Sequence, residues 1–103
     1  MDITAEELKT RLSANEDFVL IDVREPWEYD EFNLGGRLIP LGNVMQDVSE
    51  LYDEKNKEII VYCRSGQRSG MAKSILTQMG YTHVRNLLGG VMEWQSKFGS
   101  DKI

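Results

Sequence analysis

The residues with the clearest chemical potential are consecutive, one cysteine followed by a short polar segment. Cys63 is the only cysteine of the chain, and the residues after it are Arg64, Ser65, Gly66, Gln67, Arg68 and Ser69. Cysteine reacts as the thiolate, and a free thiol with a pKa of about 8.5 is only a few per cent thiolate at neutral pH. A nucleophile at this position therefore needs surroundings that stabilise negative charge on its sulfur.

The flanking residues predict such surroundings. The apolar run 59–62 predicts a strand, and the pattern from Ser69 to Met79 predicts a helix, so Cys63 falls at their junction. The first turn of a helix offers N–H groups without intrahelical partners and the positive end of the helix dipole. Gly66 permits backbone angles closed to other residues. We expect the amides of residues 64–68 and of the first helical turn to surround Sγ, and a fall of about two pKa units, roughly 2.7 kcal/mol, would make thiolate the main form.

The ordinary interpretation of a lone cysteine at a strand end is a buried core thiol. The segment 64–69 carries two arginines, two serines and a glutamine, which is too polar for a core. This composition favours Cys63 as a catalytic nucleophile and residues 64–69 as an anion-binding loop.

Strand and helix patterns alternate along the chain and must position this loop. Strands are expected at Ile3, 18–23, 38–39, 58–62 and 83–88. Helices are expected at 4–15 with Thr4 as N-cap, from Pro26, along the stripe Val44, Val48 and Leu51, at 69–79, and after Gly89-Gly90. This alternation predicts an α/β fold, a single domain over residues 1–103 with a mainly parallel central sheet of about five strands and helices on both faces. Ligands bind such sheets at the carboxyl ends of the strands, where Cys63, Arg24 and Gly89 are expected.

Composition excludes several classes of function. The net charge of −5 gives no electrostatic reason to bind nucleic acid or an anionic membrane. The N-terminus lacks the basic and apolar regions of a signal peptide, and no stretch approaches a membrane span. One cysteine and one histidine, His83, are too few for a zinc site, and no metal or cofactor is expected. A single free thiol suits a reducing compartment, so we expect a cytoplasmic monomer.

Other residues near the strand ends have structural interpretations. We expect Asp22 and Arg24 to organise the fold beside the site, with Arg24 paired to a nearby carboxylate, for which Glu28 is a candidate. Trp27 and Trp94 are expected to pack between helix and sheet. The five methionines fall mainly at helical core spacing and need no cofactor.

The segment 62–69 resembles the active-site loop of the rhodanese family of sulfurtransferases. Three further segments resemble family motifs in the same order, namely 20–25 with Glu28-Tyr29, 39–41, and 86–90 with Trp94. The resemblance covers essentially the whole chain, although residues 32–38 depart from the commoner family pattern.

The resemblance implies covalent sulfur transfer. The Cys63 thiolate would attack the outer sulfur of a donor such as thiosulfate, and the resulting persulfide would pass its sulfur to cyanide or a thiol. Arg64 and Arg68 would attract the anionic donor. Two alternatives stay open, a persulfide carrier that serves a protein partner in a sulfur relay for cofactor or tRNA thiolation, and a catalytically silent interaction module. Cysteine phosphatases have five residues between cysteine and arginine, whereas four separate Cys63 from Arg68, so we expect no useful phosphatase activity.

Overall fold

Four parallel strands form the central sheet of the structure, which is a computed structural model that describes residues 1–47 and 55–100. The strands are β1 (Val19–Asp22), β2 (Arg37–Leu38), β3 (Ile59–Tyr62) and β4 (Val84–Asn86), in the spatial order β2-β1-β3-β4. Ile3, the expected fifth strand, forms only an isolated parallel bridge to Leu87. Every residue of β1 and β3 is buried, which is typical of parallel strands covered on both faces.

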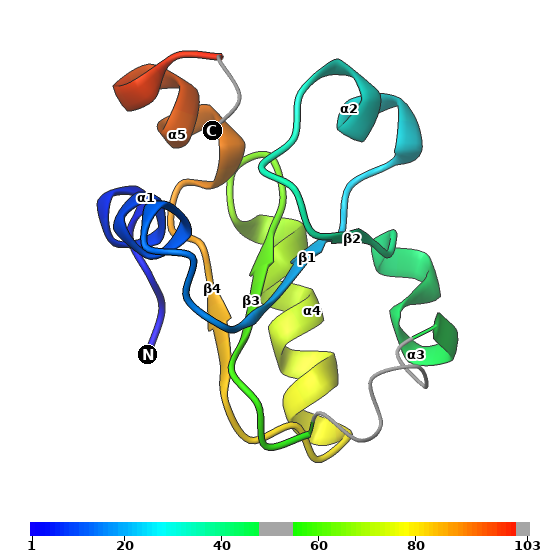
Figure 1. Cartoon of the computed structure of the whole chain (residues 1–103). Coiled ribbons are helices and arrows are strands. Elements are labelled where there is room, and N and C mark those ends of the chain that lie inside the picture. The colour runs from blue at the N-terminus through cyan, green and yellow to red at the C-terminus, as the bar shows by residue number, and fades with distance from the viewer. Residues whose placement is uncertain (48–54, 101–103) are drawn as a thin grey trace.

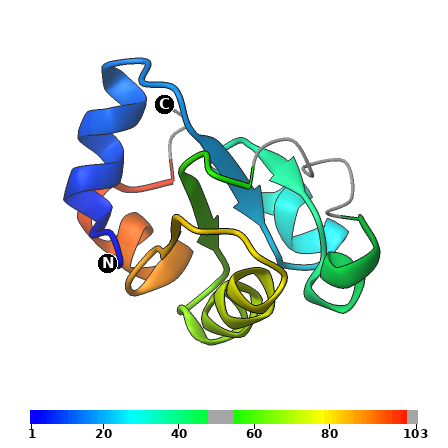
Figure 2. The same ribbon diagram turned by 90° about the horizontal axis from the view of Figure 1, so that it is seen from below.

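Helices cover both faces of this sheet, as the alternating pattern predicts (Figures 1 and 2). They are α1 (Ala5–Ser13), α2 (Pro26–Glu31), α3 (Val44–Asp47), α4 (Gln67–Gln78) and α5 (Gly90–Phe98), with a short 3-10 turn, η1 (Leu41–Asn43), before α3. Figure 2 shows α1 and α5 together on one side and α4 along the other. None of the helices in the described residues is long and apolar enough to cross a membrane.

Two apolar cores lie on the two faces of the sheet. Alternate side chains of a strand point to opposite faces, so Leu20 and Ile60 join one core while Ile21 and Val61 join the other. The first core is completed by α1 and α5, from residues that include Leu8, Val91 and Trp94. The second is completed by α3 and α4, from residues that include Val44, Ala72 and Leu76.

Local capping explains where the helices begin. The side chain of Thr4 accepts a hydrogen bond from the Glu7 amide at 3.1 Å, which confirms Thr4 as the N-cap of α1. The helix α4 begins at Gln67, two residues before the expected Ser69, because Gly66 caps it with φ of +107°. Of the stripe expected for the third helix, Val44 is buried in α3, while Val48 and Leu51 lie outside the described residues.

An ion-pair cluster closes the end of the sheet opposite the cysteine loop. The Glu58 carboxylate, just before β3, binds the guanidinium groups of Arg11 from α1 and Arg85 from β4. Hydrogen bonding from Arg11 is the main reason that the pKa of Glu58 falls to about 2. This end of the molecule therefore contributes to stability in a pH-dependent way.

The expected packing of the tryptophans is half right. Trp94 is 1% exposed, within the first core. Trp27 is 64% exposed, so the expectation that it packs onto the sheet was wrong. The short helix α2 turns Glu28 inward instead, and Trp27, the residue before it, points outward.

The expectation of core methionines was also wrong for Met45, Met71 and Met92, which are more than half exposed.

Candidate active site

The cysteine loop lies at the carboxyl end of the sheet, where ligands bind in folds of this class. Cys63 is the first residue after β3, and α4 begins four residues later at Gln67. The loop emerges between α5 on one side and α2 on the other (Figure 1). The cysteine is a free thiol and is 1% exposed.

Three hydrogen-bond donors converge on the sulfur of Cys63. The backbone amides of Gly66 and Ser69 lie 3.1 and 3.4 Å from Sγ, and the Ser69 hydroxyl lies 3.3 Å from it. Burial raises the pKa of the thiol, but the Ser69 hydroxyl and the amides of Ser69, Gly66 and Ser65 together outweigh burial, so the pKa lies below its ordinary value. The sulfur is thus buried and at the same time surrounded by donors that favour its thiolate.

The first turn of α5 keeps the loop amides turned toward the sulfur. The amides of Val91 and Met92 donate to the carbonyl groups of Cys63 and Arg64, each at 2.9 Å. Because the carbonyl and N–H of a trans peptide point in opposite directions, the N–H groups of the same two peptides face away from α5. Gly90 makes this approach possible, since its φ is +59° and a Cβ there would lie 2.5 Å from the carbonyl carbon of Arg64.

A second brace comes from Asn86 at the end of β4. Its Nδ2 donates to the carbonyl of Gly66 at 3.1 Å, which leaves Oδ1 facing the Ser69 hydroxyl at 2.5 Å. The hydroxyl has one proton and two acceptors, Oδ1 and the sulfur, so its bond to Cys63 competes with its bond to Asn86. Sequence reasoning missed Asn86 as a site residue, and the available signal was a polar side chain at the carboxyl end of a strand beside β3.

Asp22 and Arg24 form a buried pair beside the loop. Arg24 donates to both carboxylate oxygens of Asp22, through Nε at 3.0 Å and Nη2 at 2.8 Å, and to the carbonyl of Phe32 at 2.6 Å. The expectation that Arg24 pairs with a nearby carboxylate is confirmed, but the partner is Asp22 and not Glu28. These bonds tie the end of β1 to the segment after α2.

Glu28 binds Arg68 instead, through two parallel hydrogen bonds. Arg68 Nη1 and Nη2 lie 2.7 and 2.9 Å from the two carboxylate oxygens. This bidentate contact is the main reason that the pKa of Glu28 falls to about 2, so the group is ionised at neutral pH. The charge of Arg68, which sequence analysis assigned to attracting an anion, is therefore balanced by a carboxylate that sequence analysis did not place in the site.

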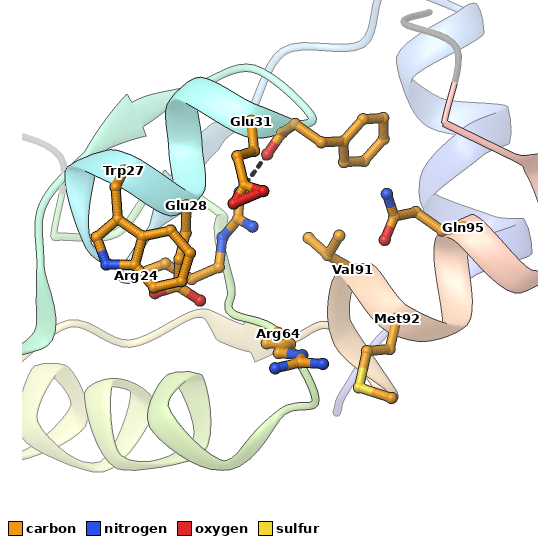
Figure 3. Close-up of a pocket in the computed structure, with 9 residues that line it drawn as sticks. Arg24, Trp27, Glu28, Glu31, Arg64, Val91, Met92 and Gln95 are labelled. Carbon is orange, nitrogen blue, oxygen red and sulfur yellow. Dashed lines mark hydrogen bonds between the residues drawn. The ribbon is translucent and has the colours of Figure 1, made fainter.

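The remaining cation of the loop, Arg64, is exposed and lines a cavity of about 300 Å³ between α2 and α5. Figure 3 shows Trp27, Glu28 and Glu31 on the α2 side, Val91, Met92 and Gln95 on the α5 side, and Arg64 between them. Arg64 forms no ion pair with the part of the chain that the structure describes. It is the loop arginine that can meet an anion without first breaking a salt bridge.

The other predicted loop residues differ in whether the backbone or the side chain contacts the sulfur. Ser65 and Gln67 have exposed side chains, and Ser65 acts on the sulfur through its amide. Gly66 and Ser69 contact the sulfur directly. Within residues 1–47 and 55–100, no group of three or more histidine, cysteine, aspartate or glutamate side chains is arranged to hold a metal ion.

Comparison with known proteins agrees with this geometry. The profile of the rhodanese-like domain matches residues 4–97. A sulfurtransferase from Allochromatium vinosum is 37% identical over 94 residues, which cover 90% of this chain and 86% of that protein. The thiosulfate sulfurtransferase PspE of Escherichia coli is 44% identical over 70 residues, 67% of each chain.

Among solved structures, a rhodanese-related protein from Thermoplasma volcanium superimposes with a TM-score of 0.81 at 28% identity, over 94% of this chain and 92% of that one. The sequence relatives support rhodanese-type sulfur transfer as the class of activity. The chain belongs to the rhodanese-like domain family.

Proposed function

We propose that this protein moves a sulfane sulfur from a donor such as thiosulfate to cyanide or a thiol, through a persulfide on Cys63. The observation that carries the proposal is the set of donors on Sγ, the amides of Gly66 and Ser69 and the Ser69 hydroxyl. A cysteine whose thiolate is favoured in this way needs no separate general base.

The first half-reaction forms the persulfide. The Cys63 thiolate attacks the outer sulfur of thiosulfate, a new S–S bond forms to Sγ, and the bond within thiosulfate breaks, so that sulfite leaves with its electron pair. The exposed guanidinium of Arg64 attracts the incoming anion at the cavity beside the loop. The product is an anionic persulfide.

The second half-reaction returns the enzyme to its starting state. The carbon of cyanide, or the sulfur of a thiolate, attacks the outer sulfur, and the Cys63 thiolate leaves with the electron pair of the S–S bond. The loop amides that favoured the thiolate at the start also favour it as leaving group. Two separate half-reactions predict ping-pong kinetics.

Thiocyanate production from thiosulfate and cyanide tests the proposal, with Cys63→Ala as the inactive control. Turnover that depends on Cys63 and shows parallel double-reciprocal lines supports it. Turnover that persists in Cys63→Ala would refute the role of this thiol. Negligible turnover together with a stable persulfide would favour the carrier alternative, in which a protein partner takes the sulfur.

A single free thiol of this kind suits a reducing compartment such as the cytoplasm.

A further inference from the structure

The Glu28–Arg68 pair fixes the local charge beside the nucleophile. The Glu28 side chain is 9% exposed and that of Arg68 is 32% exposed, and two hydrogen bonds join them. The Glu28 carboxylate also accepts from the Glu25 amide at 3.0 Å, which fixes it to the first turn of α2. The carboxylate is thus held in place from both sides.

Arg68 is close enough to Cys63 for the two charges to interact. Negative charge on the Cys63 sulfur is one of the causes that raise the pKa of Arg68, after the bonds to Glu28. Without Glu28, the guanidinium would therefore present a full positive charge to any group that approaches the sulfur. With Glu28 in place, the carboxylate opposes that field.

The other charges around the site also cancel. Asp22 neutralises Arg24 in the buried pair described above. The cavity is lined by the Arg64 guanidinium and by the Glu31 carboxylate, which carry opposite charges. The formal charges of the three arginines and three carboxylates described at this site therefore sum to zero.

We propose that Glu28 sets the charge preference of the site, because its neutralisation of Arg68 makes Cys63 favour neutral or singly charged sulfane-sulfur donors, such as organic persulfides, over dianions such as thiosulfate. Glu28 acts through Arg68 and is a positioning residue. Its assignment to donor choice rests on the proposed sulfur transfer, whereas its effect on the charge around Cys63 does not.

The test measures the charge felt at Cys63 without any sulfur transfer. Iodoacetate and iodoacetamide alkylate the same thiolate, and they differ in one negative charge. The rate constant for iodoacetate divided by that for iodoacetamide, measured at one pH, does not depend on the thiolate fraction. This ratio therefore reports the local electrostatic potential. The ratio is measured at low ionic strength for the wild type, Glu28→Gln, Arg68→Gln and the double variant.

The four proteins form a double-mutant cycle, and the charges predict the order of their alkylation ratios. If the added charge interacts with the charge of iodoacetate by about 1 kcal/mol, as neighbouring charges do in water, the ratio changes about fivefold. Glu28→Gln should raise the ratio by this factor and Arg68→Gln should lower it, while the double variant should return to the wild-type value. Added salt should reduce all of these differences.

An unchanged ratio in Glu28→Gln at low ionic strength would overturn the inference. If that variant does not fold, the comparison of Arg68→Gln with the double variant decides, because these two proteins differ only at Glu28, and the ratio must be higher in the double variant. The KM for thiosulfate should fall in Glu28→Gln by up to roughly the square of this factor, because thiosulfate carries two negative charges and iodoacetate one. A shifted ratio with unchanged KM would overturn the donor preference. Absence of thiosulfate turnover in every variant would refute the proposed thiosulfate reaction, and the alkylation ratio would still decide the effect of Glu28 on local charge.

Discussion

Replacement of Ser69 by alanine tests how the loop holds its thiolate. The substitution removes the hydroxyl that lies 3.3 Å from the Cys63 sulfur and keeps the amide that lies 3.4 Å from it. Ser69 is fully buried in the first turns of α4, where alanine is a good helix former. The substitution removes one hydrogen-bond donor, which serves both the Cys63 sulfur and Asn86 Oδ1.

The expected size follows from the geometry of that hydroxyl. A hydrogen bond to a charged group contributes about 1.5 to 3 kcal/mol. Asn86 Oδ1 competes for the same proton at 2.5 Å, which reduces the gain from the bond to the sulfur. We take about 1.4 kcal/mol, which corresponds to about one pKa unit. Because the hydroxyl favours the thiolate, its loss should raise the pKa of Cys63, so the alkylation rate at neutral pH should fall by up to about tenfold.

The assay is the rate of iodoacetamide alkylation against pH. Ser69→Ala should shift the midpoint to higher pH and leave the high-pH plateau unchanged. Ser65→Ala is the matched control, since this exposed serine acts on the sulfur through an amide that the substitution retains. A midpoint in Ser69→Ala at or below that of the wild type would show that the wild-type hydroxyl donates its proton to Asn86 Oδ1 and not to the sulfur, and it would refute this account of the hydroxyl.

Three further predictions concern the scaffold. Gly90→Ala should destabilise the fold and reduce thiocyanate production at least about tenfold, because its Cβ would strike loop backbone. Gly99 is the control, because its φ of +79° is comparable but a Cβ there would have no atom within 4 Å. Gly99→Ala should lower the melting temperature less than Gly90→Ala and keep activity. Equal losses in the two variants would contradict the packing argument. Glu58→Gln should lower the free energy of unfolding by about 2 kcal/mol at pH 7, after a discount for solvent screening. The folded pKa of Glu58, about 2, lies below the ordinary 4.5, so the difference in unfolding free energy should be present above pH 4.5 and fade toward pH 2. Urea titrations measure it, and a difference that persists at pH 2 would exclude the ion pairs as its source. Tyr62→Phe removes a hydroxyl that donates to the Gly35 carbonyl at 2.9 Å and accepts from a backbone amide. Urea titration should therefore show a free energy of unfolding lower by about 1 to 3 kcal/mol. No loss would mean that water replaces the hydroxyl as hydrogen-bond partner.

Much of the fold could be predicted because its signals are local. The buried runs that became β1 and β3, and the cap at Thr4, are each encoded within a few neighbouring residues. The same holds for the cysteine loop, since a strand, a glycine and a helix start follow one another directly around Cys63. Periodicity and capping are sufficient for features of this kind.

The partners of the site residues could not be predicted, because they come from distant parts of the chain. Glu28 meets Arg68 across 40 positions, and Asn86 meets Ser69 across 17. Sequence spacing gave no reason to prefer Glu28 over Asp22 as the partner of Arg24, since both lie within four residues of it. The exposure of Trp27 follows from the inward turn of Glu28, so one missed contact caused both errors.

The most direct test of sulfur transfer is the mass of the protein after exposure to excess thiosulfate. The account predicts an increase of one sulfur atom, mapped to Cys63, which disappears on addition of cyanide with release of an equal amount of thiocyanate. The Cys63→Ser variant should gain nothing. Failure of the wild type to gain sulfur from thiosulfate or from an organic persulfide, or the same gain in Cys63→Ser, would contradict the claim that this thiolate carries the sulfur.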